Sequence, residues 1–196
     1  MHDLEQLCFM EEVEKGLIPL DQANMGLYRY FGSNERVKPL IAILSNVSPD
    51  QFWPTFFETW PMCDATGQFN NALLKLLRQQ KIQGNEWLKY VSPHIQKLYK
   101  TLPDVLTIYR GCVGPTIEYS GTVRRISWTL DRKIAEGFGR GHRSIKLPNP
   151  VVAEANYPKA EILALNLKRR EREVLIDPRR LRGLKLHHHS TISQEE

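Results

Sequence analysis

The sequence predicts an α+β protein, because helical periodicity in its first half gives way to short β-rich runs in its second half. Apolar side chains recur at steps of three and four through the first hundred residues. From about residue 101, apolar runs bounded by Pro and Gly replace that pattern. The chain has 196 residues, of which 41% are hydrophobic and 25% are charged, so it can bury a core. We expect a helical region over 1–100, a β-rich region over 101–186 and a polar, disordered tail over 187–196.

Six helical segments are expected in the helical region. The first ends at Gly16 and places Leu4, Leu7 and Cys8 on one face. The last contains Pro93, which is expected to kink or split it. The expected ranges are 3–16, 22–31, 36–44, a helix that begins at Ser48-Pro49-Asp50, 69–81 and a helix that begins at Asn85.

Aromatic residues follow one another at helical spacing in the fourth segment. They are Phe52, Trp53, Phe56, Phe57 and Trp60. Such a ridge can form a core, an interface or a base-stacking surface, but helical periodicity requires a buried face. We therefore interpret these rings as core.

The β-rich region is expected to contain six strands and one short helix over about 131–138. The expected strands are 104–110, 124–129, 150–156, 161–167, 173–177 and 182–186. Glycines at the end of the short helix and basic residues among them predict a flexible basic loop. This loop would comprise Gly137, Gly139, Arg140, Gly141, His142 and Arg143.

Composition argues against several classes of protein. No apolar run reaches the roughly 18 residues of a membrane span, and the acidic start Met1-His2-Asp3 does not resemble a signal peptide. The three cysteines form no Cys-x-x-Cys pair, and the adjacent histidines 187–189 offer poor ligand geometry for a metal. The scattered cysteines indicate a reducing, cytoplasmic environment, and we expect no bound metal.

Positive charge is concentrated in the second half of the chain. Residues 1–100 carry 10 Lys/Arg and 11 Asp/Glu, a net charge of −1, whereas residues 101–196 carry 17 and 11, a net charge of +6. Positive potential attracts a dinucleotide pyrophosphate, an acidic protein or nucleic acid. A merely soluble basic surface has the same composition, so charge does not discriminate among these.

Two carboxylates, Glu171 and Glu173, stand one residue apart before the apolar run 174–176. In an extended segment, residues i and i+2 face the same side, so both carboxylates would project into one cleft and Arg172 would point away. Two carboxylates this close repel each other and shift each other's pKa, so a neighbouring cation or a functional role is expected. The alternative interpretation is a solvated charged turn.

Two upstream motifs bear on that choice. The strand 104–110 ends in Arg110-Gly111, and Ser127-Trp128-Thr129 leads into the short helix. In this order, together with Glu-x-Glu, the motifs resemble the Arg-Ser-Glu class of mono-ADP-ribosyltransferases, of bacterial toxin and phage type. The resemblance covers roughly 101–186 and implies a split β-sandwich ADP-ribosyltransferase-like domain preceded by a helical accessory or docking region.

The resemblance implies a role for each motif residue. Glu173 would bind a ribose hydroxyl of NAD+ and support the sugar cation, and Glu171 would act as general base toward the acceptor. Arg110 would hold the pyrophosphate and ribose region, and Gly111 would read the nicotinamide amide. Ser127 would orient the catalytic glutamate, with the Thr129 hydroxyl two residues on. The motif departs mildly from Ser-Thr-Ser.

Other assignments remain open at this stage. Phe138 could stack on nicotinamide or belong to a helical apolar face with Ile134 and Ala135. Arg110 could pair with a surface carboxylate, and Ser127-Trp128-Thr129 could be an ordinary strand before a helix cap at Thr129 or Asp131. His142 and Arg143 could contact the adenosine phosphates of NAD+. Arg169 and Arg170 could recognise the target protein or neutralise the paired carboxylates.

The resemblance therefore implies a transferase of ADP-ribose from NAD+ to a protein side chain, with nicotinamide released and no metal required, in the cytoplasm of a producing bacterium or of a cell that receives it. In that family a Glu-x-Glu pair goes with arginine acceptors, so the resemblance implies arginine as the acceptor, and water could serve as an alternative acceptor. The target protein is unknown, and neither a membrane nor nucleic acid is an expected partner. The competing hypothesis is an inactive binding module whose basic β-domain engages nucleic acid or an acidic protein.

Overall fold

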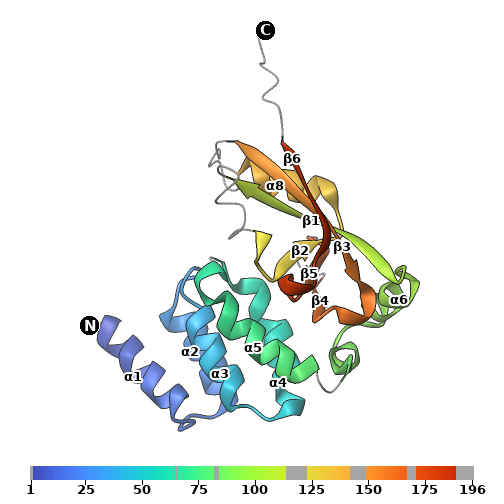
Figure 1. The fold of residues 1–196 in the computed structure, drawn as a ribbon. Coiled ribbons are helices and arrows are strands. Elements are labelled where there is room, and N and C mark those ends of the chain that lie inside the picture. The colour runs from blue at the N-terminus through green and yellow to red at the C-terminus, as the bar shows by residue number, and fades with distance from the viewer. Residues whose placement is uncertain are drawn as a thin grey trace. The chain divides into compact units, whose positions relative to one another are not determined.

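The computed structural model describes residues 2–64, 66–81, 84–113, 123–141, 149–166 and 171–188. The chain divides into two compact units, Met1–Ser92 and Pro93–Glu196 (Figure 1). The first unit is helical, and the second contains an antiparallel six-stranded sheet. The expected α+β class with helices at the N-terminus is confirmed.

Helices of the first unit lie close to their expected positions. They are α1 (His2–Glu14), α2 (Leu20–Tyr30), α3 (Val37–Asn46), α4 (Pro49–Thr59) and α5 (Asn70–Lys81). Ser48 and Gln51 form a capping box that starts α4, and Pro61 follows close behind its end. The expected sixth helix is split, because a 3-10 turn over Glu86–Tyr90 ends before α6 (Pro93–Thr101) begins.

The aromatic ridge of α4 is core, as expected. Phe52, Trp53, Phe56, Phe57 and Trp60 are each at most 6% exposed. The Phe56 ring stacks on Trp60 with centroids 5.6 Å apart and meets Trp53 edge to face at 5.8 Å. Offset and edge-to-face pairs of this kind add to the stabilisation that comes from burial.

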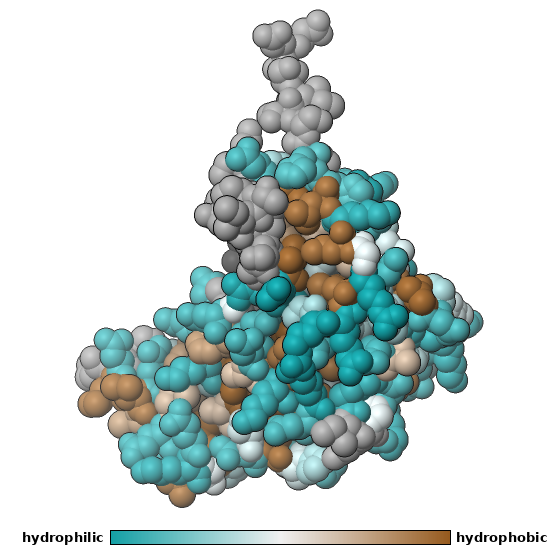
Figure 2. Space-filling view, viewed as in Figure 1, coloured by the Kyte–Doolittle hydropathy of each residue, from teal (hydrophilic) through white to brown (hydrophobic). Residues whose placement is uncertain are grey.

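The predicted buried face of α1 is wrong. Leu4 and Leu7 are 66% and 67% exposed, whereas Phe9 and Val13 are buried. Phe9 faces Gly26 of α2 so closely that a Cβ at Gly26 would lie 2.1 Å from the Phe9 ring, and this contact fixes which side of α1 is covered. Figure 2 shows apolar side chains at the surface where α1 lies.

The sheet of the second unit has the strand order β4-β5-β2-β1-β3-β6, and all its neighbours are antiparallel. Its strands are β1 (Val105–Val113), β2 (Ser127–Thr129), β3 (Pro150–Pro158), β4 (Ala164–Asn166), β5 (Glu173–Leu175) and β6 (Arg182–His188). All six overlap the expected strands. β2, β4 and β5 have three residues each, so one half of the sheet, from the edge strand β4 to β2, consists of short strands.

The expected start of the polar tail is wrong, because β6 continues through His188. His187 pairs with Val152 of β3, and its Nε2 lies 3.1 Å from Oε2 of Glu154. Pairing with a neighbouring strand thus extends β6 into a polar sequence whose composition alone suggested disorder.

The expected glycine-rich loop is also corrected. Gly137 and Gly139 lie within α8 (Arg132–Arg140), and Gly141 with φ 119° follows its end. Gly139 is buried, and a Cβ there would lie 3.2 Å from the Val151 carbonyl oxygen. The glycine therefore lets the helix approach the sheet closely rather than making a loop. His142 and Arg143 lie outside the described residues.

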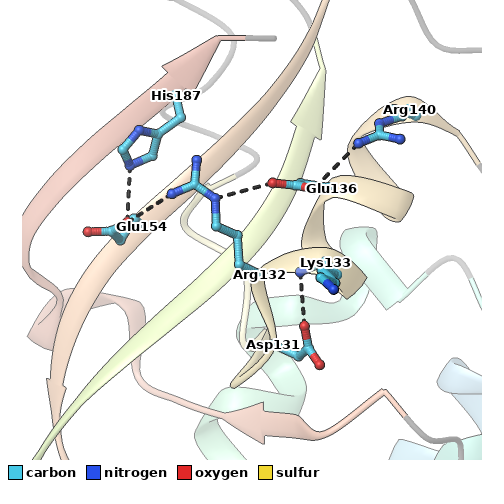
Figure 3. A network of polar contacts seen from close by, with 7 residues as sticks. All are labelled: Asp131, Arg132, Lys133, Glu136, Arg140, Glu154 and His187. Carbon is cyan, nitrogen blue, oxygen red and sulfur yellow. Dashed lines mark hydrogen bonds and ion pairs between the residues drawn. The ribbon is translucent and has the colours of Figure 1, made fainter.

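A polar network holds α8 against the sheet (Figure 3). Asp131 caps the helix by accepting a hydrogen bond from the Lys133 amide at 2.9 Å. Arg132 lies 3.2 Å from Glu136 on its own helix and 3.7 Å from Glu154 on β3. Glu154 thus joins α8 to β3 and, through His187, to β6 (Figure 3). Asp131, rather than Thr129, is the cap of α8.

Helix α6 belongs to the sheet-containing unit, so the helical unit ends at Ser92 rather than at residue 100. Lys159, directly after β3, donates from Nζ to the Leu102 carbonyl at 2.6 Å. The same ammonium lies 5.8 Å from the centre of the Tyr99 ring. These contacts attach the end of α6 to the end of β3.

Within the described part of the chain, no helix has both the length and the apolar composition to cross a membrane. The same residues contain no group of three or more His, Cys, Asp or Glu side chains arranged to hold a metal ion.

Candidate functional site

Three motif residues that are distant in sequence are connected by hydrogen bonds. Arg110, on β1, donates from its guanidinium to the carbonyl oxygen of Ser127 on β2. The Ser127 hydroxyl in turn donates to Oε1 of Glu173, at the start of β5, at 2.5 Å. The order of strands explains this meeting, because β2 lies between β1 and β5. We call Arg110, Ser127 and Glu173 the central triad.

Strand register places the Glu173 carboxylate in a row of polar side chains. Glu173 pairs with Thr129 on β2 and with Asn166 on β4. Residues directly opposite on neighbouring strands have Cβ atoms roughly 5 Å apart, close enough for their side chains to interact. Glu173 is 7% exposed, so its carboxylate contacts these polar neighbours rather than bulk water.

Asn166 is a site residue that the sequence analysis missed. Its side-chain nitrogen donates to Oε2 of Glu173 at 2.9 Å, and it is 4% exposed. Ser127 and Asn166 therefore bind the two different oxygens of one carboxylate. The signal was an asparagine in the apolar run Ile162-Leu163-Ala164-Leu165, since a buried amide requires a hydrogen-bonding partner.

Arg110 supplies a positive charge beside this carboxylate. Burial lowers the pKa of the Arg110 guanidinium, Cys112 and Glu173 raise it, and Arg125 lowers it. The pKa of an arginine starts so high that the group stays protonated at neutral pH. Arg110 is half-buried on β1, and one carboxylate that raises its pKa is that of the buried Glu173.

The extended geometry expected for the two glutamates is wrong. Strand β5 begins only at Glu173, and Arg172 has φ 47°, in the left-handed region. A side chain other than glycine adopts this conformation at a cost, so the alternation of an extended strand does not hold across Glu171-Arg172-Glu173. Glu171 is half-buried on the bend before the strand.

Thr129 braces that bend. Its hydroxyl donates to the Glu171 carbonyl oxygen at 2.6 Å and accepts from the Asp131 amide at 3.1 Å. The Leu130 amide donates to the Arg172 carbonyl at 3.1 Å. These bonds tie the end of β2 to the segment that carries Glu171. Thr129 is 5% exposed, so its hydroxyl stabilises the segment around Glu171 from a buried position.

Gly111 and Phe138 lie against each other where α8 packs on β1 (Figure 1). A Cβ at Gly111 would lie 2.3 Å from the Ala135 carbonyl oxygen and 2.8 Å from the Phe138 Cβ. The glycine is therefore required for packing of the helix. Phe138 is 40% exposed, which contradicts the core alternative for this ring, whereas Ala135 is fully buried.

The structure thus brings Arg110, Ser127 and Glu173 together and places Thr129 and Glu171 directly beside them. Gly111 follows Arg110 on β1, and Phe138 on α8 packs against Gly111. Arg169 and Arg170 lie outside the described residues. The arrangement is a fixed, buried anion flanked by a hydroxyl, an amide and a guanidinium, and it can stabilise positive charge that develops nearby.

Comparison of the chain with known protein families, with curated proteins and with solved structures found no match. The function of the site is therefore inferred from its residues and their geometry.

Proposed function

We propose that the protein is a mono-ADP-ribosyltransferase that uses NAD+ as substrate. The observation that carries the proposal is the central triad, in which an arginine, a serine and a glutamate from three strands form one chain of hydrogen bonds. These are the three residues by which the sequence resembles the Arg-Ser-Glu transferases. Their order and their connection support the proposal together.

The reaction breaks the bond between the nicotinamide nitrogen and the ribose carbon. Nicotinamide leaves with the bonding electron pair as a neutral molecule, and positive charge spreads over the ribose. Glu173 stabilises this charge, and Ser127 and Asn166 hold its carboxylate in place. Arg110 suits the pyrophosphate, because its planar fork binds two phosphate oxygens at once.

The shape of the sheet is consistent with a split β-sandwich. β1 and β2 pair at Tyr109 and Thr129, whereas β1 and β3 pair along nine residues from Val105 to Val113. Because β1 and β2 share so short a pairing, the sheet can open between β1 and β2. The central triad spans this narrow junction, since Arg110 lies on one side and Ser127 and Glu173 lie on the other.

We further propose that the acceptor is an arginine side chain of a protein. Glu171 stands two residues before Glu173 and is held by Thr129, so its carboxylate can orient a guanidinium and take its proton as the new carbon–nitrogen bond forms. Water in place of the guanidinium would give hydrolysis of NAD+. The helical unit is proposed to dock the target protein.

A transfer assay tests this function. The full chain is incubated with adenosine-labelled NAD+ and a cell lysate, and mass spectrometry then locates the labelled side chains. We expect ADP-ribose on arginine, and none when Glu171→Gln replaces the wild type. Labelled residues other than arginine would contradict the assignment of the acceptor, and absence of both transfer and NAD+ cleavage would contradict the function.

A second function is favoured by the burial of Glu173. Both of its oxygens accept hydrogen bonds from protein groups, which also suits a carboxylate that only stabilises the sheet of an inactive binding module. In that case wild type and Glu173→Gln would both leave NAD+ intact, and the variant would unfold more readily. NAD+ cleavage by the wild type excludes this alternative.

A further inference from the structure

We infer that Asn166 is a positioning residue for Glu173, one that fixes the orientation of the carboxylate in the reaction. The inference rests on the proposed function, and it adds a residue that none of the three sequence motifs contains. It concerns the two ends of one hydrogen bond, between Asn166 Nδ2 and Glu173 Oε2, 2.9 Å long.

The strand pairing creates this contact. Asn166 and Glu173 are direct partners in the β4–β5 register, and the pairs beside them are Leu165 with Val174 and Ala164 with Leu175. Those four flanking residues are completely buried. An amide in such surroundings is costly unless it is hydrogen-bonded, so the site accommodates Asn166 through its contact with Glu173.

The two oxygens of Glu173 have different partners on different strands. Oε1 accepts from Ser127 on β2, and Oε2 accepts from Asn166 on β4. Two donors on opposite sides prevent the carboxylate from rotating about its terminal bond. A hydroxyl and an amide are both neutral donors, and together they hold the carboxylate in one orientation relative to a nearby sugar cation.

The charges around this carboxylate define the expected pH behaviour. Arg110 on β1 interacts electrostatically with Glu173, and Arg125, before β2, acts on Arg110. Glu171 and Arg172 directly precede Glu173 on the chain. An aspartate in place of Asn166 would add a second buried carboxylate at hydrogen-bonding distance. Two carboxylates sharing a site retain one proton, so the acidic limb of the activity profile must move to higher pH.

The decisive experiment measures kcat against pH for NAD+ cleavage by wild type, Asn166→Asp and Asn166→Ala. In Asn166→Asp we expect the acidic limb to rise by about one pH unit or more. In Asn166→Ala we expect kcat to fall by about tenfold to a hundredfold with a smaller change in KM, because a charge-assisted bond is lost. The matched control is Asn156→Asp, an exposed position on β3 of the same sheet, which should leave the profile unchanged.

The result that overturns the inference is an Asn166→Asp profile that coincides with that of the wild type, or an Asn166→Ala variant with unchanged kcat. If Asn166→Asp does not fold, the ratio of kcat to KM effects in Asn166→Ala decides. A wild type without NAD+ cleavage defeats the proposed function instead. Titration of the Glu173 carboxyl by nuclear magnetic resonance, in wild type and Asn166→Ala, then tests the positioning contact without activity.

Discussion

The hydroxyl of Tyr157 joins three segments of the second unit. It donates to the Glu161 carbonyl oxygen at 3.2 Å and accepts from the Asp177 amide at 3.0 Å, and the residue is fully buried. Burial raises the pKa of Tyr157, so the hydroxyl keeps its proton at neutral pH and both bonds persist. The residue thus connects the end of β3 to the segment that follows β5.

Replacing Tyr157 with Phe is expected to lower the free energy of unfolding by about 1–3 kcal/mol, because the Asp177 amide would be left buried without its acceptor. Urea denaturation followed by circular dichroism measures this change. Tyr90→Phe, at a side chain 36% exposed, is the control and should have little effect. Equal stability of Tyr157→Phe and the wild type would refute this role for the hydroxyl.

At this scale the sequence could identify only part of the site. The types and order of Arg110, Ser127 and Glu173 were visible in the motifs. The positive φ of Arg172 and the Asn166 amide were not visible, because both depend on which strands become neighbours of β5. A single asparagine in an apolar run signals that a partner exists but does not say which one.

Among the elements, the packing of α8 on the sheet depends on two glycines, Gly111 and Gly139, whereas a third, Gly137, has different surroundings. Gly111 on β1 and Gly139 on α8 lie where helix and sheet touch, and their Cα–Cβ distance would be 3.7 Å if Gly139 carried a Cβ. Gly137 has no neighbouring atom within 4 Å of where its Cβ would be. A side chain is therefore tolerated at Gly137, but not at Gly111 or Gly139, where the helix touches the sheet.

Gly111→Ala is expected to destabilise the second unit by about 1–3 kcal/mol, because its Cβ would overlap backbone atoms of α8. Gly137→Ala, within the same helix, should instead stabilise it by up to about 1 kcal/mol through better helix propensity. Thermal unfolding of the two variants measures both effects. Destabilisation by Gly137→Ala, or a neutral Gly111→Ala, would show that the helix does not pack on β1 as described.

Element positions were predictable where local sequence determines them. β1, β3, β4 and β5 lie in apolar or β-branched runs near a proline or asparagine, and all six strands were expected within a few residues of their places. The extension of β6 to His188, the glycines inside α8 and the exposed face of α1 were not predictable. Each depends on contact with a distant segment: β3, β1 and α2, respectively.

At the scale of the whole molecule, the division of the chain agrees with the division of its charge. The helical unit, with 8 Lys/Arg and 11 Asp/Glu, has a net charge of −3, whereas the unit that contains the central triad, with 19 and 11, has a net charge of +8. NAD+ carries a negatively charged pyrophosphate, which a basic surface attracts. The proposed work is thus divided, with the sheet-containing unit binding and cleaving NAD+ and the helical unit contributing to choice of target.

The measurement that tests this account most directly is the rate of nicotinamide release from NAD+ by the full chain. It is compared for wild type, for Glu173→Gln, and for Glu161→Gln as a control whose side chain pairs with Arg180 on the surface. We expect Glu173→Gln to lower the rate by at least about 10²–10³-fold while it stays folded, since the charge that stabilises the sugar cation is lost. Glu161→Gln should match the wild type. Nicotinamide release that is undiminished in Glu173→Gln, or no release from the wild type, would contradict the account.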